Sequence, residues 1–260
     1  MSNAKRVAVI TGGAQGIGRR TSELLAERGF SIAIIDLQEP NATAQAVEKL
    51  GGELLSFTGD ICREEVVDAF ARNVTSRFGR VDVLVNNAGI SLIRPAEHTT
   101  AAEYRRVMEV NLVAPFLLAQ TFGRMMLAAR SGSIVNVASI AGLAGVSDRA
   151  AYNASKHGLV GLTRTLAAEW GGRGVRVNAV CPGWVKTEMD VADQAGGGYS
   201  DADITSRVPM GRFASPDDIA SAIAFLADER LSGYINGHTL SVDGGWAADG
   251  SWDSLRVRHR

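Results

Sequence analysis

The chain has 260 residues and a formal net charge of −1, a size that suits one α/β domain with a substantial core. The near-zero charge gives no electrostatic reason to expect nucleic acid, and no uninterrupted apolar run reaches the roughly 18 residues of a membrane span, so we expect neither partner. The two cysteines and four histidines lack metal-ligand spacing, which argues against a metal site and favours a reducing, cytoplasmic location.

Short runs rich in Val, Ile and Leu alternate with longer helical patterns along the chain. Strand-like runs lie at 6–12, 31–37, 53–61, 81–89, 131–139, 175–183 and 238–245. Helical patterns lie at 19–28, 41–52, 63–79, about 101–129 and 148–162. The strands are nearly continuously apolar, which is typical of parallel strands that are covered on both faces. We therefore expect a single-domain Rossmann fold over 1–260, with a doubly wound parallel sheet of about seven strands and helices on both faces.

The segment 188–215 breaks this alternation. It contains a run of three glycines among polar residues and resembles neither a buried strand nor a long helix. We expect it to form a mobile lid.

The stretch TGGAQGIG at 11–18 joins the first predicted strand to the first predicted helix. Its Gly12, Gly16 and Gly18 allow a tight turn and let backbone N–H groups approach a pyrophosphate at the helix N-terminus. A glycine-rich turn without a ligand is the alternative. The loop lacks the G-K-[ST] ending of an ATP- or GTP-binding loop.

Asp36 ends the second predicted strand. A carboxylate there accepts hydrogen bonds from the two ribose hydroxyls of adenosine and repels a 2′-phosphate. Leu37 and Gln38 follow, with no Arg to pair that phosphate. The pattern favours NAD over NADP, although Asp36 could also simply cap the strand end.

Four polar residues form a candidate catalytic set. Tyr152 and Lys156 are four residues apart in a predicted helix and share one face. Ser139 ends the fifth strand, at the edge where open α/β sheets bind ligands. Asn111 is a lone amide in the apolar helix VMEVNLVAPF, with Pro115 four residues later, which could free the Asn111 carbonyl to bind water. Taken singly, Ser139 could be only a strand-end hydroxyl and Asn111 only a helix-kink residue.

With these motifs in family order, the chain resembles the short-chain dehydrogenase/reductase family, in its branch of about 250 residues. The resemblance covers nearly the whole chain through TGGAQGIG, NNAG at 86–89, Asn111, Ser139, YNASK at 152–156 and PG at 182–183. It implies a homotetramer, with the YNASK helix packed against its mate in another subunit. It also implies that Asn86 and the following turn support the adenosine side, Asp60 and Ile61 contact adenine, and Val185 and Thr187 contact the nicotinamide carboxamide.

The resulting set of cofactor-binding residues is Gly12, Gln15, Gly16, Ile17, Gly18, Asp36, Leu37, Asp60, Ile61, Asn87, Ala88, Gly89, Tyr152, Lys156, Pro182, Gly183, Val185 and Thr187.

The implied reaction is the interconversion of a secondary alcohol and a ketone. A free Tyr has a pKa near 10, so Tyr152 needs the Lys156 ammonium and the cationic nicotinamide to lower its pKa before it can act as a base. Ser139 would donate a hydrogen bond to the substrate oxygen, and Asn111 would anchor a water that relays the proton. The hydride chemistry belongs to the cofactor.

The substrate is less well defined. Arg149 lies three residues before Tyr152, Arg94 follows the fourth strand, and a basic tail over 246–260 ends in Arg260. Trp246 and Trp252 could anchor this tail, and an Arg from it could reach a neighbouring subunit's cleft; a solvated tail is the alternative. Because Arg pairs with carboxylates, these residues favour a sugar acid or a related hydroxy or keto acid.

Other functions stay open. A 3-oxoacyl-carrier reductase usually prefers NADPH, which Asp36 disfavours, and a polyol or sugar dehydrogenase would take a neutral substrate. A sugar-nucleotide epimerase usually has a larger C-terminal domain, and a non-catalytic NAD sensor needs no base such as Tyr152.

Overall fold

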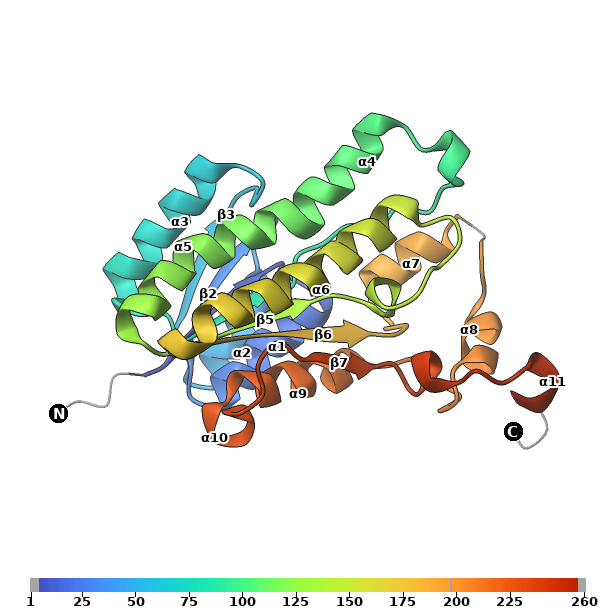
Figure 1. Ribbon diagram of the computed structural model, residues 1–260. Helices are drawn as coiled ribbons and strands as arrows, with labels where there is room; N and C mark the ends of the chain where they lie inside the picture. Colours follow the sequence, from blue (N-terminus) through green and yellow to red (C-terminus); the bar gives the residue numbers. More distant parts are fainter. Residues whose placement is uncertain (1–4, 197, 257–260) are drawn as a thin grey trace.

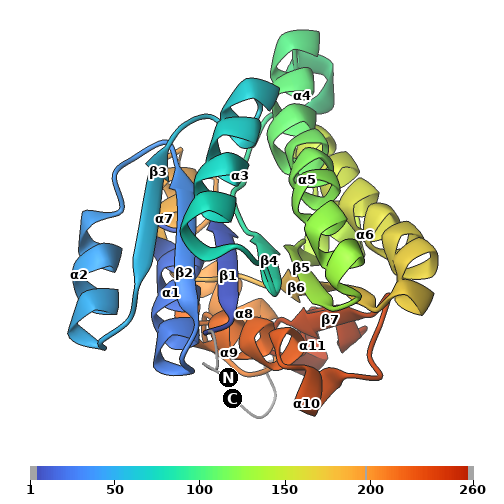
Figure 2. The same ribbon diagram turned by 90° about the vertical axis from the view of Figure 1, so that its left-hand side faces the viewer.

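The computed structural model describes residues 5–196 and 198–256 and contains a seven-stranded sheet (Figures 1 and 2). The strand order is β3-β2-β1-β4-β5-β6-β7, and each neighbouring pair is parallel. The strands are β1 Val7–Thr11, β2 Ser31–Asp36, β3 Leu54–Thr58, β4 Val83–Asn86, β5 Gly132–Val137, β6 Val175–Pro182 and β7 Thr239–Val242. The order reverses direction between β1 and β4, which is the position where doubly wound sheets bind their ligands.

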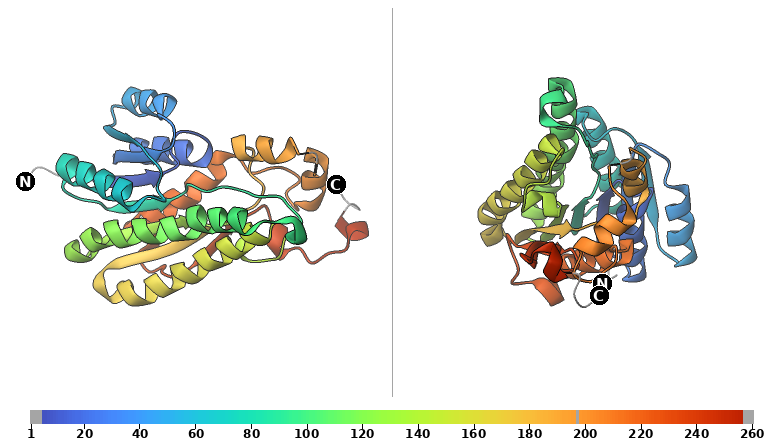
Figure 3. Two further views of the ribbon diagram at one scale, coloured as in Figure 1. Left: turned by 90° about the horizontal axis from the view of Figure 1, so that it is seen from above. Right: turned by 90° about the vertical axis from the view of Figure 1, so that its right-hand side faces the viewer.

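Helices cover both faces of this sheet. The helices are α1 Gly16–Glu27, α2 Asn41–Lys49, α3 Glu64–Phe78, α4 Ala101–Met108, α5 Ala114–Ala129, α6 Ala150–Trp170, α7 Glu188–Gln194, α8 Asp201–Arg207, α9 Pro216–Ala227, α10 Glu229–Ser232 and α11 Asp253–Arg256. Helices α1 and α9 pack together on one face, while α3, α5 and α6 cover the other, with α5 and α6 side by side (Figures 1 and 3).

The two larger hydrophobic cores among the described residues result from the alternation of side chains along the strands. In β1, Ala8 and Ile10 face the core under α1 and α9, while Val9 faces the core that contains Phe70 and Phe122 of α3 and α5. Because both faces are covered, strands such as β1 are buried along their whole length. The predicted Rossmann fold with about seven parallel strands is confirmed.

The predicted long helix at about 101–129 is continuous but changes its winding in the middle. Residues Glu109–Val113 form a π-helical turn between α4 and α5, and Asn111 lies within it. This stretch is long and apolar enough to cross a membrane by composition, but here Leu118, Phe122 and Met126 are buried in the core beside the sheet. Helix α9, which sequence reasoning did not single out, begins with a capping box formed by Ser215 and Asp218.

The lid region 188–215 carries two short helices, α7 and α8, beyond the carboxyl end of β6 (Figure 1). In the described part of the C-terminal tail, helix α11 packs against α8. Asp249 joins the two, because it pairs with Arg207 of α8 and with Arg256 of the tail. Of the two predicted tail anchors, Trp246 stacks under the Arg207 guanidinium at 4.7 Å, whereas Trp252 is 78% exposed.

Candidate active site

A cavity of about 380 Å³ opens along the carboxyl edge of the sheet. Residues that end or follow six successive strands line it, including Gly12, Asp36, Asp60, Asn87, Ser139 and Pro182. Parallel strands all direct their carboxyl ends to this edge, so segments far apart in the sequence meet there. Residues of the segment 188–215, which is the predicted lid, also line the cavity, among them Glu188 and Asp193.

The glycine loop forms one end of the cavity. Gly12 and Gly16 have φ values of 66° and 54°, in the left-handed region that favours glycine. Gly18 serves close packing, because a Cβ there would lie 2.1 Å from the Gly12 carbonyl oxygen; it is the one predicted cofactor residue of this loop that does not line the cavity. The loop thus brings bare backbone to the start of α1, which fits the pyrophosphate of a dinucleotide.

Asp36 is held in place by two backbone N–H groups. Its Oδ2 accepts a hydrogen bond from Ala14 at 2.9 Å, and its Oδ1 accepts one from Gln38 at 3.0 Å. The carboxylate therefore orders the glycine loop and also lines the cavity beside Leu37. The strand-end cap and the predicted ribose contact are compatible, since each carboxylate oxygen has a second lone pair.

The NNAG segment contributes through Asn87 rather than Asn86. Asn87 donates hydrogen bonds from Nδ2 to the carbonyls of Thr11 and Gly12, both at 2.9 Å, and lines the cavity. Asn86 is buried and donates to Asn136 Oδ1 at 2.8 Å in the sheet interior. The predicted turn after Asn86 therefore lines the cavity, but Asn86 itself does not, because its side chain is held in the sheet interior by Asn136.

The remaining predicted cofactor residues are brought together by the fold. Those that line the cavity are Gln15, Ile17, Asp60, Ile61, Ala88, Gly89, Tyr152, Lys156, Pro182, Gly183, Val185 and Thr187. The Cys62 N–H donates a hydrogen bond to Asp60 Oδ1 at 3.0 Å and so orients the Asp60 carboxylate. These surroundings combine glycine backbone, a strand-end carboxylate and an extended slot between loops, so they fit a nicotinamide dinucleotide.

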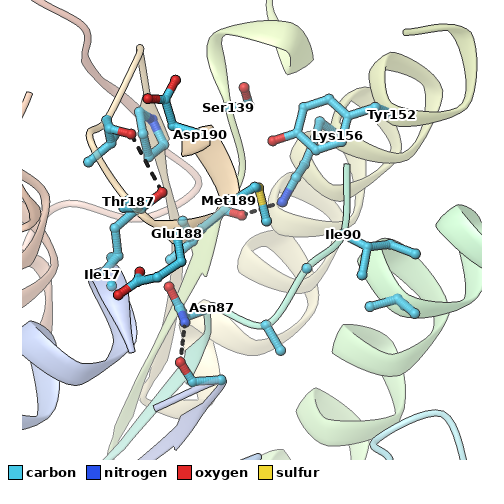
Figure 4. A pocket seen from close by; sticks show the side chains of 18 of the residues that line it. Ile17, Asn87, Ile90, Ser139, Tyr152, Lys156, Thr187, Glu188, Met189 and Asp190 are labelled. Carbon is cyan, nitrogen blue, oxygen red and sulfur yellow. Dashed lines mark hydrogen bonds between the residues drawn. The ribbon is translucent and has the colours of Figure 1, made fainter. Parts of the chain in front are cut away.

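Ser139, Tyr152 and Lys156 meet at the other end of the cavity (Figure 4). Lys156 donates a hydrogen bond from Nζ to the Val137 carbonyl oxygen at 2.8 Å, and Nζ lies 5.6 Å from the centre of the Tyr152 ring. The Oγ of Ser139 accepts a hydrogen bond from the Ala141 N–H at 3.1 Å, and Ser139 lines the cavity together with Tyr152 and Lys156. The fold therefore brings the predicted i, i+4 pair and the strand-end serine to the same end of the cavity.

Burial controls the ionisation of both catalytic groups in the protein alone. Burial raises the pKa of the Tyr152 phenol, opposed by the hydrogen bond with Ser139 and the charge of Arg149. Burial also lowers the pKa of the Lys156 ammonium to about 8. Burial has the largest effect on the Tyr152 pKa in the protein without the dinucleotide. The lowering expected from Lys156 and the oxidised nicotinamide together stays a prediction.

Asn111 positions the loop that follows β4. Its Nδ2 donates to the Ile90 carbonyl at 2.9 Å and to Ser155 Oγ at 3.1 Å, and its Oδ1 accepts from the Ile90 N–H at 2.9 Å. The side chain is completely buried, and these bonds satisfy the amide. The water relay predicted at the Asn111 backbone carbonyl stays a prediction. Asn111 lies in the π-helical turn, and its side chain also positions the loop after β4.

The predicted substrate residues are distributed differently from expectation. Arg149 lines the cavity but is paired: its Nη1 lies 3.1 Å from Asp193 Oδ2 and 2.8 Å from Ser91 Oγ. Arg94 does not line the cavity; its side chain is 45% exposed and pairs with Glu103, so its assignment to the substrate site is wrong. Arg260 lies outside the described residues.

Sequence reasoning missed the lid side of the site. Asp190 and Asp193 of α7 both line the cavity; Asp190 accepts a hydrogen bond from the Tyr199 hydroxyl at 3.1 Å, and Tyr199 packs on Trp184 with ring centres 4.9 Å apart. The only sequence signal was the spacing of three acidic residues at 188, 190 and 193 in a segment without a regular pattern.

Comparison with known proteins agrees with this geometry. A family model described as enoyl-(acyl carrier protein) reductase matches residues 12–247. The chain belongs to the short-chain dehydrogenase/reductase family. Its members bind a nicotinamide dinucleotide, and the chain is an oxidoreductase of the alcohol dehydrogenase type that interconverts alcohols and ketones.

Individual relatives cover almost the whole chain. D-threitol dehydrogenase of Mycolicibacterium smegmatis is 41% identical over 93% of this chain and 92% of its own length. Cis-4-hydroxycyclohexanecarboxylate dehydrogenase of Sinomonas cyclohexanicum is also 41% identical, over 94% and 98%. The crystal structure of levodione reductase matches with a TM-score of 0.90 and 35% identity, over 94% of this chain and 98% of the other. Because the first relative is named for a neutral polyol and the second for a carboxylate, identity alone does not select a substrate.

Proposed function

We propose that this protein is an NAD-dependent dehydrogenase that oxidises a secondary hydroxyl of a small neutral polyol or sugar, or reduces the corresponding ketone. The observation that carries the substrate class is the pairing of Arg149 with Asp193 at the catalytic end of the cavity. This choice favours the neutral-substrate alternative over the sugar acid that the arginines of the sequence suggested.

The charges around the cavity support a neutral substrate. Three cationic side chains line it in the part of the chain that the structure describes. Arg106 lies near Asp60 at 3.4 Å, Lys156 is bound to the Val137 carbonyl, and Arg149 is paired with Asp193. Both arginines of the cavity thus already face a carboxylate, and Lys156 is assigned to Tyr152 and the cofactor ribose. A carboxylate substrate would therefore lose its hydration without gaining an unpaired arginine, a cost that hydroxyl groups do not have.

The preference for NAD is argued from Asp36. Its carboxylate lines the cavity, and its neighbours Leu37 and Gln38 carry no positive charge. A 2′-phosphate at the adenosine ribose would stand against this carboxylate without a cation to pair it, whereas two ribose hydroxyls can donate to it.

The catalytic roles follow from the contacts at the other end. Tyr152 takes the proton from the substrate hydroxyl, or returns it in the reverse direction. Ser139 lines the same end of the cavity as Tyr152 and donates a hydrogen bond to the substrate oxygen. Lys156 supplies positive charge beneath Tyr152 and can hold the nicotinamide ribose. A nicotinamide dinucleotide held by the residues that line the cavity would supply the hydride chemistry.

The family-level expectations complete the proposal. We propose a cytoplasmic homotetramer that acts in carbohydrate metabolism, with α6 packed against its mate in another subunit. Light scattering of the purified protein tests the tetramer.

The experiment that tests the function is a substrate panel read by NADH absorbance. Alditols, aldoses, aldonic acids, cyclic alcohols and hydroxyacyl thioesters are each offered with NAD and with NADP, and Tyr152→Phe serves as the inactive control. We expect the highest kcat/KM for a neutral polyol or sugar with NAD. A higher value for an acid, for an acyl thioester or with NADP would refute the corresponding part of the proposal.

A further inference from the structure

Three side chains from separate parts of the chain meet above the catalytic tyrosine. Arg149 donates from Nη1 to Ser91 Oγ at 2.8 Å and to Asp193 Oδ2 at 3.1 Å. Ser91 donates to the same Asp193 oxygen at 3.0 Å. Ser91 follows β4, Arg149 precedes α6, and Asp193 belongs to the lid helix α7. Each member contacts the other two, so the group forms a closed triangle.

The triangle is both buried and close to the reacting groups. The side chains of Arg149 and Asp193 are 9% and 17% exposed. The Arg149 guanidinium carbon lies 5.9 Å from the centre of the Tyr152 ring and 5.5 Å from that of Trp184. A charge in such a place is weakly screened, so its state of pairing strongly affects any charged group that enters the cavity.

An unpaired arginine at this position would be an effective binding site for a carboxylate. Its planar guanidinium matches a carboxylate in shape and charge, and it could bind one with two hydrogen bonds. In this chain the Asp193 carboxylate is already bound to the Arg149 guanidinium, where the carboxylate of a substrate would bind. An anionic substrate would have to displace the Asp193 carboxylate, and would then leave it buried without its partner.

We infer that Asp193 is a specificity-determining residue, which neutralises Arg149 from the lid and so excludes carboxylate substrates from the cavity. This inference rests on the proposed function and deepens it, because it names the residue that selects neutral over anionic alcohols. Ser91 bonds both Arg149 and Asp193 and so keeps the two side chains together. The Asp193 carboxylate repels an anionic substrate, and specific sites combine such repulsion with attractive contacts to the correct substrate.

A simple mechanical role makes a different prediction. If the pair only fastens the lid, removal of the Asp193 charge loosens the lid and reduces kcat/KM for neutral and anionic substrates by similar factors. If the pair excludes anions, the same change raises kcat/KM for the acid relative to the polyol. The ratio of the two values therefore separates the roles.

The test compares an alditol with the aldonate that differs from it only by a terminal carboxylate in place of the terminal CH₂OH, for example threitol and threonate. Asp193→Asn preserves the shape and an acceptor for Arg149 and Ser91 but removes the charge. We expect the acid-to-polyol ratio of kcat/KM to rise by about tenfold or more, as one newly available charged hydrogen bond implies. The double variant Asp193→Asn with Arg149→Gln should lose this gain.

A matched control removes a lid charge away from the cavity. Asp201 of α8 is 59% exposed, pairs with Lys186 and does not line the cavity. Asp201→Asn should leave the ratio within about twofold of the wild-type value, because an exposed charge in water is well screened. Asp193→Ser provides the same test with a smaller neutral side chain if the amide variant does not fold.

The possible failures are distinguishable. If the wild-type enzyme prefers the aldonate, the proposed function is wrong. If it prefers the alditol but Asp193→Asn and Asp193→Ser leave the ratio unchanged, the neutral substrate stands and the role of Asp193 is overturned. A gain that persists in the double variant would also overturn the inference, because the acid would then be recognised by a group other than Arg149.

Discussion

The ammonium of Lys156 donates a hydrogen bond to the backbone carbonyl of Val137 at a distance of 2.8 Å. This bond fixes α6 to the end of β5 and places the cation beneath the ring of Tyr152. The lysine is only 4% exposed, and a neutral carbonyl is its hydrogen-bond partner. The protein therefore holds a charge in its interior at a thermodynamic cost.

This cost can be measured by replacing Lys156 with Met. Burial lowers the pKa of Lys156 from its ordinary 10.5 to about 8, so at pH 7 the buried ammonium destabilises the fold by about 3 kcal/mol. The variant loses one hydrogen bond worth about 1 kcal/mol. We expect Lys156→Met to be inactive but more stable by about 2 kcal/mol in denaturant unfolding at pH 7.

The pH dependence gives the sign of this effect. Between pH 8 and 10.5 the unfolded chain keeps the Lys156 proton while the folded protein releases it, so wild-type stability rises with pH in this window. The advantage of Lys156→Met should shrink between pH 7 and 9.5. A variant less stable than wild type at pH 7, measured without dinucleotide and at equal protein concentration, would contradict the assignment of a buried ammonium.

Removal of the Tyr152 hydroxyl isolates the proton-transfer step. Tyr152→Phe keeps the ring that packs beside Arg149 and Lys156 but removes the acid and base. We expect kcat to fall by at least about 10³-fold, while the dissociation constant for NADH, followed by nicotinamide fluorescence, changes less than about threefold. Activity close to wild type would reassign the base.

The charges around Tyr152 should move its pH profile in opposite directions. Arg149 lowers and Asp193 raises the pKa of the phenol, alongside the effects of burial, Ser139 and Cys181. Oxidation needs the phenolate, so kcat/KM rises with pH through this pKa. Asp193→Asn should shift the rise to lower pH and Arg149→Gln to higher pH, each by about one unit. Shifts in the same direction would show that the pair acts only through the lid.

The cofactor preference should depend on the charge of Asp36. Asp36→Asn keeps an oxygen that can accept from the Ala14 N–H and so can preserve the glycine loop. It loses the negative charge that, in the proposed complex, would face the adenosine ribose. We expect the ratio of kcat/KM for NAD over NADP to fall by about tenfold or more. An unchanged ratio, together with unchanged thermal unfolding, would remove Asp36 from cofactor selection.

The parts of the site that could be predicted are those set by local geometry. Tyr152 and Lys156 are one helical turn apart, so their shared face follows from the helix itself. Ser139 follows from its place at the end of a parallel strand, because all such ends meet at one edge. Of the predicted NNAG segment, the turn after the strand reaches the cavity through Asn87, Ala88 and Gly89, whereas Asn86 at the end of β4 is buried in the sheet interior.

The parts that could not be predicted depend on the path of irregular segments. Arg149 was correctly placed near Tyr152, but its partner Asp193 lies 44 residues further along, in a segment without periodicity. Arg94 is a similar case, because its backbone N–H donates to the Asp148 carbonyl at 2.7 Å while its side chain turns away to Glu103. The backbones of Arg94 and Arg149 are neighbours, yet the Arg94 side chain pairs with Glu103 and the Arg149 side chain pairs with Asp193.

The lid lies between β6 and α9 in the chain, while Ser139 follows β5 and Tyr152 and Lys156 belong to α6. Its described polar ties to the body include Asp193 with Arg149 and Arg207 with Asp249. The whole segment 188–215 can therefore differ in length and polarity while the residues proposed for proton transfer, Ser139, Tyr152 and Lys156, stay in place. Grafting the corresponding segment of a relative between Thr187 and Pro216 should transfer the substrate range of that relative. The graft also needs the residue at position 149 that pairs with the new segment, as Arg149 pairs with Asp193 here.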